Sequence, residues 1–104
     1  GQSFYDITPL GTSLTGATFT IASTGTPQTI TVNKASHGLI AGDIILLDSV
    51  TPPTGSGYTA SDLETNPFQV LSSTTDTFTI EFATAASGVT SATGSATIKP
   101  YDQP

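Results

Sequence analysis

The sequence predicts a small all-β domain, on the strength of its length, its composition and a repeated alternation of polar and apolar residues. The 104 residues are enough for one domain and too few for two ordinary ones. Threonine, whose branched Cβ suits a pleated strand, is abundant, whereas the charged residues that cover most helices make up only 10% of the chain. We therefore expect a small antiparallel barrel or sandwich of six strands with one long loop.

The first two strands are expected at residues 18–22 and 28–33, where polar and apolar side chains alternate. The Gly and Pro residues between these segments predict a turn, so the two strands should form a hairpin. Residues 1–16 show no sustained periodicity and predict an N-terminal arm or connector. The β-barrel domain is expected to occupy residues 17–99, followed by a C-terminal tail at residues 100–104.

A compact turn is expected where two glycines bracket a short apolar pair. The residues expected to shape it are His37, Gly38, Gly42 and Asp43, and the glycines should supply backbone angles that a Cβ would block. The turn leads into the continuous apolar run 44–47. A run of this length predicts a central strand that is buried on both faces.

Residues 49–66 form the longest stretch without a regular pattern, and their Pro and Gly residues predict a loop. Within it, residues 61–64 are expected to form one helical turn capped by Ser61. Long loops in small domains often carry function. The candidate side chains for contact with a partner are Tyr58, Asp62 and Glu64, and the favoured alternative for Tyr58 is an aromatic ring folded over its own loop.

The last part of the chain predicts more strands around a loop of small residues at 85–93. Pro100 is expected to end the final strand, because proline cannot donate to a ladder. These strands are expected at residues 68–71, 77–82 and 96–99. The side chains expected to converge in the core are Phe19, Ile30, Val32, Ile45, Val70, Phe78, Ile80 and Ile98.

The charge balance argues against several classes of partner. The net charge is −6, and the two basic residues are Lys34 and Lys99. Phosphate backbones and anionic lipid surfaces are bound by clustered Lys and Arg, so we expect no nucleic-acid partner and no attachment to anionic membranes. No apolar run approaches the ~20 residues that a membrane span needs, so no membrane insertion is expected.

Catalytic and cofactor sites are not expected from the sequence. His37 is the one histidine and would need a nucleophile and an orienting partner to act as a base. Asp76 and Glu81 could be paired as glycosidase carboxylates, but the chain has no Trp to grip a substrate. The chain has no cysteine, and no calcium-loop spacing is present. The oxygen ligands available to a cation are Asp43, Asp48, Asp62, Glu64 and Asp76, and we expect these side chains to solvate turns instead.

Three segments together resemble a known family. The pattern His-Gly-Leu, two residues, Gly-Asp-Ile at residues 37–44 is followed by Asn-Pro-Phe-Gln-Val at 66–70 and by Asp-Thr-Phe-Thr-Ile at 76–80. This order is similar to that of the small β-barrel domain of tailed-bacteriophage virion proteins, a domain described as similar to the first catalytic-cysteine half-domain of ubiquitin-activating enzymes. The resemblance covers roughly residues 28–98, and the loop at 49–66 is longer than the family pattern.

The resemblance implies a barrel-like module of a tail, neck or fibre protein and no ubiquitin chemistry. We therefore expect a structural module without enzymatic activity that contacts other virion subunits, including copies of itself. Its location would be the virion, assembled in the host cytoplasm and extracellular in the mature particle. The alternative is a module that recognises a host-surface glycan or protein receptor through the 49–66 loop, and a third hypothesis is a small hydrolase that depends on His37.

Overall fold

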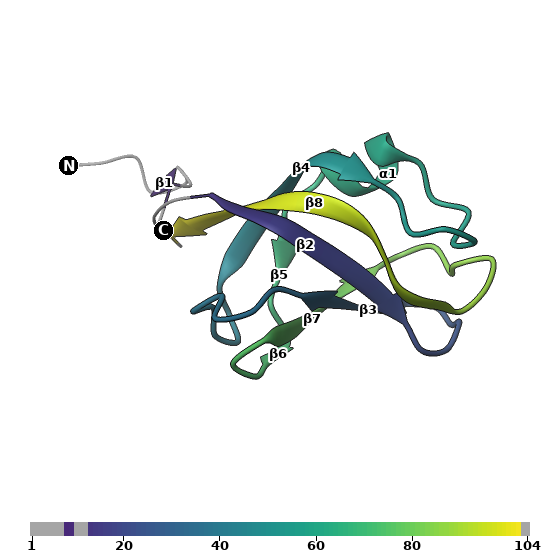
Figure 1. The fold of residues 1–104 in the computed structure, drawn as a ribbon, viewed down its shortest axis with the longest axis horizontal. Helices are drawn as coiled ribbons and strands as arrows, with labels where there is room; N and C mark the ends of the chain where they lie inside the picture. Colours follow the sequence, from purple (N-terminus) through teal and green to yellow (C-terminus); the bar gives the residue numbers. More distant parts are fainter. Residues whose placement is uncertain (1–7, 10–12, 103–104) are drawn as a thin grey trace.

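The fold is one curled antiparallel β-sheet with a short helix at its side, seen in a computed structural model that describes residues 8–9 and 13–102 (Figure 1). The strands are β1 (Thr8–Pro9), β2 (Leu14–Ile21), β3 (Gln28–Asn33), β4 (Ile44–Thr51), β5 (Phe68–Gln69), β6 (Ser72–Ser73), β7 (Thr77–Phe82) and β8 (Thr90–Asp102), and the helix is α1 (Ala60–Glu64). Along the sheet the strand order is β5-β4-β8-β2-β3-β7-β6, and β1 pairs with β8. The expected all-β, antiparallel class is confirmed.

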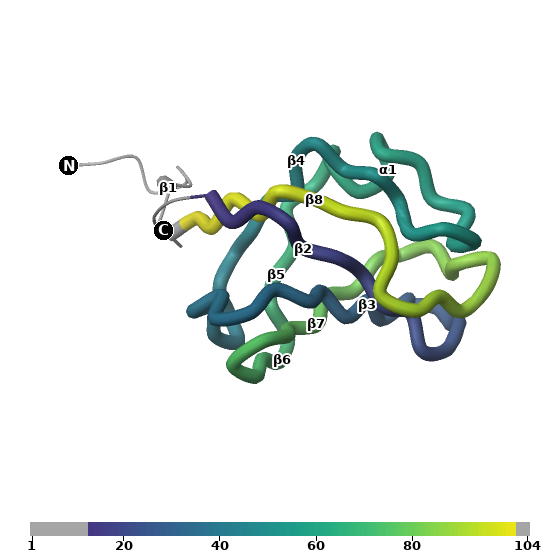
Figure 2. The backbone as a smooth tube through the Cα atoms, in the orientation of Figure 1, coloured from purple at the N-terminus to yellow at the C-terminus, as the bar shows by residue number. Residues whose placement is uncertain are grey.

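One stretch of chain bridges the two ends of this sheet. β5 pairs with β4, and β6 pairs with β7. Between these short strands, the N–H of Val70 donates to the carbonyl of Asp43 at 2.8 Å and the N–H of Leu71 donates to the carbonyl of Thr79 at 2.9 Å. Residues 68–73 therefore hydrogen-bond to both ends of the sheet, which curls into a half-barrel (Figure 2).

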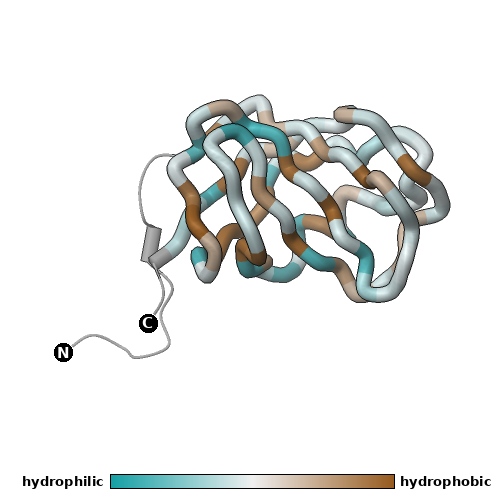
Figure 3. The backbone as a smooth tube through the Cα atoms, turned by 90° about the horizontal axis from the view of Figure 1, so that it is seen from below, coloured by the Kyte–Doolittle hydropathy of each residue, from teal (hydrophilic) through white to brown (hydrophobic). Residues whose placement is uncertain are grey.

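Alternate residues of a strand point to opposite faces of the sheet, and in β3 and β7 the residues buried in the core alternate with more exposed ones. Apolar positions accordingly recur along the strands with polar positions between them (Figure 3). Leu63 of α1 is also fully buried, so the helix contributes one side chain to the core. All of the side chains expected in the core are buried, namely Phe19, Ile30, Val32, Ile45, Val70, Phe78, Ile80 and Ile98.

The expected number of strands, six, is wrong, because the described part of the chain contains eight. The strand expected at 68–71 is regular only at residues 68–69, as β5, and β6 at residues 72–73 lies in the turn expected after it. β2 begins at Leu14 rather than at residue 18. β1 falls within the expected arm, whose residues 1–7 and 10–12 lie outside the described residues.

β8 is much longer than the strand expected at 96–99. It includes the end of the expected loop at 85–93 and continues through Pro100 into the expected tail, of which residues 103–104 lie outside the described residues. The β2–β8 ladder ends at the pair Leu14–Ile98, whereas β4 continues to pair with β8 through Pro100, which lies opposite Ile45.

The loop expected at 49–66 is shorter than predicted. β4 continues to Thr51 through an irregularity near Ser49, which has a φ of 50°. The helix is capped by Thr59 and not by Ser61, because the Thr59 side chain accepts from the backbone of Asp62. The cap therefore lies two residues earlier than the sequence indicated.

Candidate functional site

The turn that precedes β4 is organised around His37, which is 6% exposed. Its Nδ1 accepts a hydrogen bond from the N–H of Leu39 at 2.8 Å, and its Nε2 lies 2.8 Å from the carbonyl of Thr77. These two partners assign the proton to Nε2. The ring also packs edge-on against Phe78, with centroids 5.2 Å apart. Because both nitrogens are engaged by the backbone, neither is placed to accept a proton from a substrate.

The turn before β4 also contains the other three residues expected to shape it, Gly38, Gly42 and Asp43. Gly38 and Gly42 have φ angles of +74° and +98°, which favour glycine, and the N–H of Gly42 donates to the carbonyl of Val70 at 2.7 Å. The Asp43 carboxylate accepts from the N–H of Ile40 at 2.9 Å. The turn is thus held by its own side chains and by the neighbouring strand segment.

Tyr58, expected to contact a partner, is instead 8% exposed. Its hydroxyl donates to the carbonyl of Thr84, and its ring packs edge-on against Phe82 with centroids 5.1 Å apart. Burial raises the pKa of Tyr58, and the nearby charge of Asp62 adds to this effect. The ring therefore fastens the loop to β7 and leaves little surface for a partner.

Asp62 and Glu64, the other two expected contact residues, are used by the helix and its neighbour. Asp62 accepts from the N–H of Thr59 at 2.8 Å and completes a capping box. Glu64 accepts from the N–H of Val50 at 2.8 Å, which ties α1 to β4. Within residues 8–9 and 13–102, no group of three or more His, Cys, Asp or Glu side chains is arranged to hold a metal ion.

Gln28 is a key residue that the sequence reasoning missed. It is fully buried at the start of β3, where its side-chain oxygen accepts from the N–H groups of Gly25 at 3.1 Å and Ala86 at 2.9 Å. Its amide donates to two carbonyls, at 2.8 and 2.9 Å. The signal was present in the alternation, because Gln28 shares its side of the strand with the buried Ile30 and Val32.

A face of uncharged polar side chains crosses four strands on the side of the sheet away from the core, and on β7 it ends beside the exposed Glu81. Thr20 of β2 lies opposite Thr31 of β3, Thr31 lies opposite Thr79 of β7, and Thr79 lies opposite Ser72 of β6. The hydroxyls of Ser72 and Thr79 are 2.7 Å apart. A second row lies beside the first and consists of Thr18, Asn33 and Thr77. We call the two rows the neutral face, which consists of Thr18, Thr20, Thr31, Asn33, Ser72, Thr77 and Thr79.

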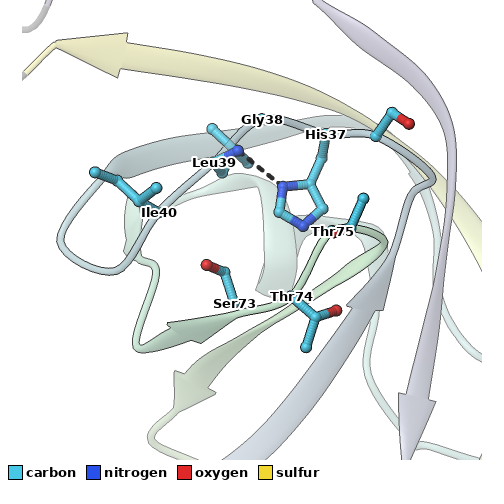
Figure 4. Close-up of a pocket in the computed structure, with 8 residues that line it drawn as sticks. His37, Gly38, Leu39, Ile40, Ser73, Thr74 and Thr75 are labelled. Carbon is cyan, nitrogen blue, oxygen red and sulfur yellow. Dashed lines mark hydrogen bonds between the residues drawn. The ribbon is translucent and has the colours of Figure 1, made fainter.

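An open hollow of about 460 Å³ lies between the turn at residues 36–40 and the β6–β7 turn at residues 73–75 (Figure 4). His37 and Leu39 form part of one wall, joined by their hydrogen bond, and the residues of the β6–β7 turn form the other. Sequence reasoning did not find this hollow, because its walls come from segments that only the strand pairing brings together.

The fold and these sites define a small β-domain in which His37 and Asp43 hold a turn and the carboxylates of Asp62 and Glu64 hold the helix α1. Comparisons with known protein families, with curated proteins and with solved structures found no match to this chain. The likeness of residues 37–80 to phage virion domains therefore remains an expectation from the sequence pattern. No helix in the described ranges has the length and hydrophobicity needed to span a bilayer.

Proposed function

We propose that this chain is a non-catalytic structural module of a bacteriophage virion, associated with the tail, neck or fibre, and that its neutral face docks on neighbouring subunits. A phage virion is proposed because the sequence pattern at residues 37–80 resembles that of a domain of tailed-bacteriophage virion proteins. The observation that carries the docking role is the register of the sheet, which aligns Thr20, Thr31, Thr79 and Ser72 in one uncharged row across four strands.

The chemistry of the neutral face suits repeated contacts between acidic chains. The chain carries a net charge of −6, so two copies repel each other over most orientations. An interface built on hydroxyls avoids the desolvation of carboxylates, which costs far more than the desolvation of neutral groups. Threonine also has a branched side chain with few rotamers, so ordering it at an interface costs little entropy.

The use of His37 supports a role without catalysis. Both ring nitrogens are occupied by backbone groups of Leu39 and Thr77, at 2.8 Å each. A hydrolase that depends on this histidine would need one nitrogen directed at a nucleophile. The third hypothesis from the sequence is therefore the one that the geometry supports least.

The alternative function, recognition of a host-surface glycan or protein through the 49–66 loop, has less support. Tyr58 faces the core side of the loop, and the carboxylates of Asp62 and Glu64 accept backbone hydrogen bonds. Removal of residues 52–65 would also delete the buried Leu63 and would confuse unfolding with loss of adsorption. The cleaner test is the exposed Thr54→Lys, for which loss of adsorption by particles that still assemble would favour this alternative.

The assembly proposal is tested by adding one charge at the centre of the neutral face. Sedimentation velocity over a concentration series should show self-association of the wild-type chain. Thr31→Glu should weaken that association by at least about tenfold, because an unpaired carboxylate would have to be desolvated at the contact. Thr24→Glu adds the same charge at an exposed turn position away from the face and should associate like the wild type.

The same pair of variants can be examined in the particle. Electron microscopy should show failed or incomplete particles for Thr31→Glu and normal particles for Thr24→Glu, with both chains folded by circular dichroism. A wild-type chain that stays monomeric at every concentration, together with normal particles for both variants, would refute docking through this face.

A further inference from the structure

The hollow between residues 36–40 and 73–75 has the chemistry of a site for an uncharged, hydroxylated ligand. Ser36, Ser73, Thr74 and Thr75 all line it, and no lining residue carries a carboxylate or an ammonium group. Ile40 also lines it and is 65% exposed, so its side chain offers apolar surface to a ligand. The hollow thus combines hydrogen-bonding groups with an apolar surface.

The walls of the hollow are held in place by the protein itself. Ile40 is fixed through its N–H, which donates to the Asp43 carboxylate at 2.9 Å. The N–H of Ser36 donates to the Asp76 carboxylate at 3.1 Å and so links one wall to the other. A site that is already ordered loses less entropy when a ligand binds, which favours measurable affinity even for a small ligand.

Several hydroxyls in the hollow are available to a ligand. Thr74 is the exception, since its hydroxyl accepts from the N–H of Thr77 at 3.1 Å and lies 2.8 Å from the Thr77 hydroxyl. The hydroxyls of Ser36, Ser73 and Thr75 make no hydrogen bond to other described residues. Each can both donate and accept, which is the pairing that sugar hydroxyls require.

We propose that this hollow binds a neutral sugar unit, a hexose or N-acetylhexosamine, at the end or within a longer glycan. The C–H face of the ring would pack on Ile40, and its hydroxyls would bond to Ser36, Ser73 and Thr75. The volume of about 460 Å³ lies within the range of small-ligand sites, roughly 300–1,000 Å³. The net charge of −6 and the carboxylate of Asp76 beside Ser36 disfavour acidic sugars.

This inference is independent of the assembly proposal and differs from the loop-based receptor alternative in its location. It is tested by ¹⁵N-HSQC titration of the full chain with the methyl glycosides of glucose, galactose and N-acetylglucosamine, and with N-acetylneuraminic acid as the acidic comparison. At least one neutral glycoside should shift amide signals of residues 36–40 and 73–75 saturably, with a Kd on the order of 1 mM, as expected for a small open site.

Two exposed aliphatic residues give a matched pair of variants. Ile40→Ser should weaken binding about tenfold, because it removes the apolar surface beneath the sugar ring. Val89→Ser changes a side chain of nearly equal exposure, 64% against 65%, outside the hollow and should bind like the wild type. Ser73→Ala should also weaken binding, through loss of one hydroxyl.

Three outcomes would overturn the sugar site. These are the absence of localised shifts with every neutral glycoside, tighter binding of N-acetylneuraminic acid than of any neutral glycoside, and equal effects of the Ile40→Ser and Val89→Ser changes. Each leaves the assembly proposal intact, because that proposal is read from self-association of the chain and from particle formation.

Discussion

Gly94 should be among the positions in the sheet where substitution is most damaging, and Gly16 provides its matched control. Gly94 lies in β8 with a φ of +74°, and Gly16 lies in β2 with a φ of +79°. A Cβ built on Gly94 would lie 2.5 Å from the carbonyl oxygen of Thr51 and 2.9 Å from the nitrogen of Pro53. A Cβ built on Gly16 would have no atom within 4 Å.

The difference between the two sites gives the expected magnitude. Either change to alanine incurs left-handed backbone strain, which costs roughly 1–2 kcal/mol. At Gly94 the new methyl also overlaps backbone atoms, which cannot rotate away as a side chain can. Overpacking of this kind adds about 1–3 kcal/mol. We therefore expect Gly94→Ala to lose about 2–5 kcal/mol of unfolding free energy and Gly16→Ala to lose about 1–2 kcal/mol.

The measurement is urea unfolding of both variants, followed by circular dichroism and fitted with a common slope. The informative quantity is the gap between the two variants, since the strain common to both cancels. Equal losses for Gly94→Ala and Gly16→Ala would refute the reasoning. They would show that the close approach of Thr51 and Pro53 to β8 does not decide which residue is tolerated at position 94.

Three further predictions concern single side chains. Gln28→Leu should lose about 1–3 kcal/mol, because a buried N–H loses its acceptor, while Gln69→Leu at an exposed site on β5 should change urea stability by less than about 0.5 kcal/mol. Burial raises the pKa of Tyr58 above 10.0, so the unfolded state loses that proton first, and stability should fall as pH rises above 10.0, less steeply in Tyr58→Phe. The hydrogen bond from Lys99, at 3.1 Å, lowers the pKa of Asp48, so Lys99→Met should raise it toward 3.8 in an NMR titration, and an unchanged value would contradict this cause.

The strands could be predicted wherever their evidence was local. In β3 and β7 the alternation of polar and apolar residues predicts which side chains are buried. The structure agrees, since the apolar members of the two strands that were expected in the core are buried, namely Ile30, Val32, Phe78 and Ile80. The length of β8 could not be predicted in this way. How far β8 continues past Pro100 depends on its pairing with β4, where Ile45 lies opposite Pro100, and Ile45 is more than fifty positions earlier in the chain.

The candidate sites were harder to predict, because they depend on contacts between distant segments. Nothing in the sequence near Ser36 indicates that residues 73–75 lie across from it. That approach depends on the pairing of β3 with β7, and the link from Ser36 to Asp76 spans 40 residues. The expectation for Tyr58 treated its loop as a surface feature, whereas packing on Phe82 turned the ring inward.

The placement of polar groups connects the two proposals. The histidine and two of the carboxylates make structural hydrogen bonds. His37 bridges two backbone segments, Asp43 accepts from the N–H of Ile40, and Glu64 joins α1 to β4. The alternation of the strands also places a row of hydroxyl side chains on the outer face of β2, β3 and β7, beside the carboxylate of Glu81. Under both proposals, such a surface would bind its partner through shape and hydrogen bonds without ion pairs. We therefore expect added salt to have little effect on sugar binding at the hollow and to strengthen self-association at the neutral face, because it screens the repulsion between acidic chains.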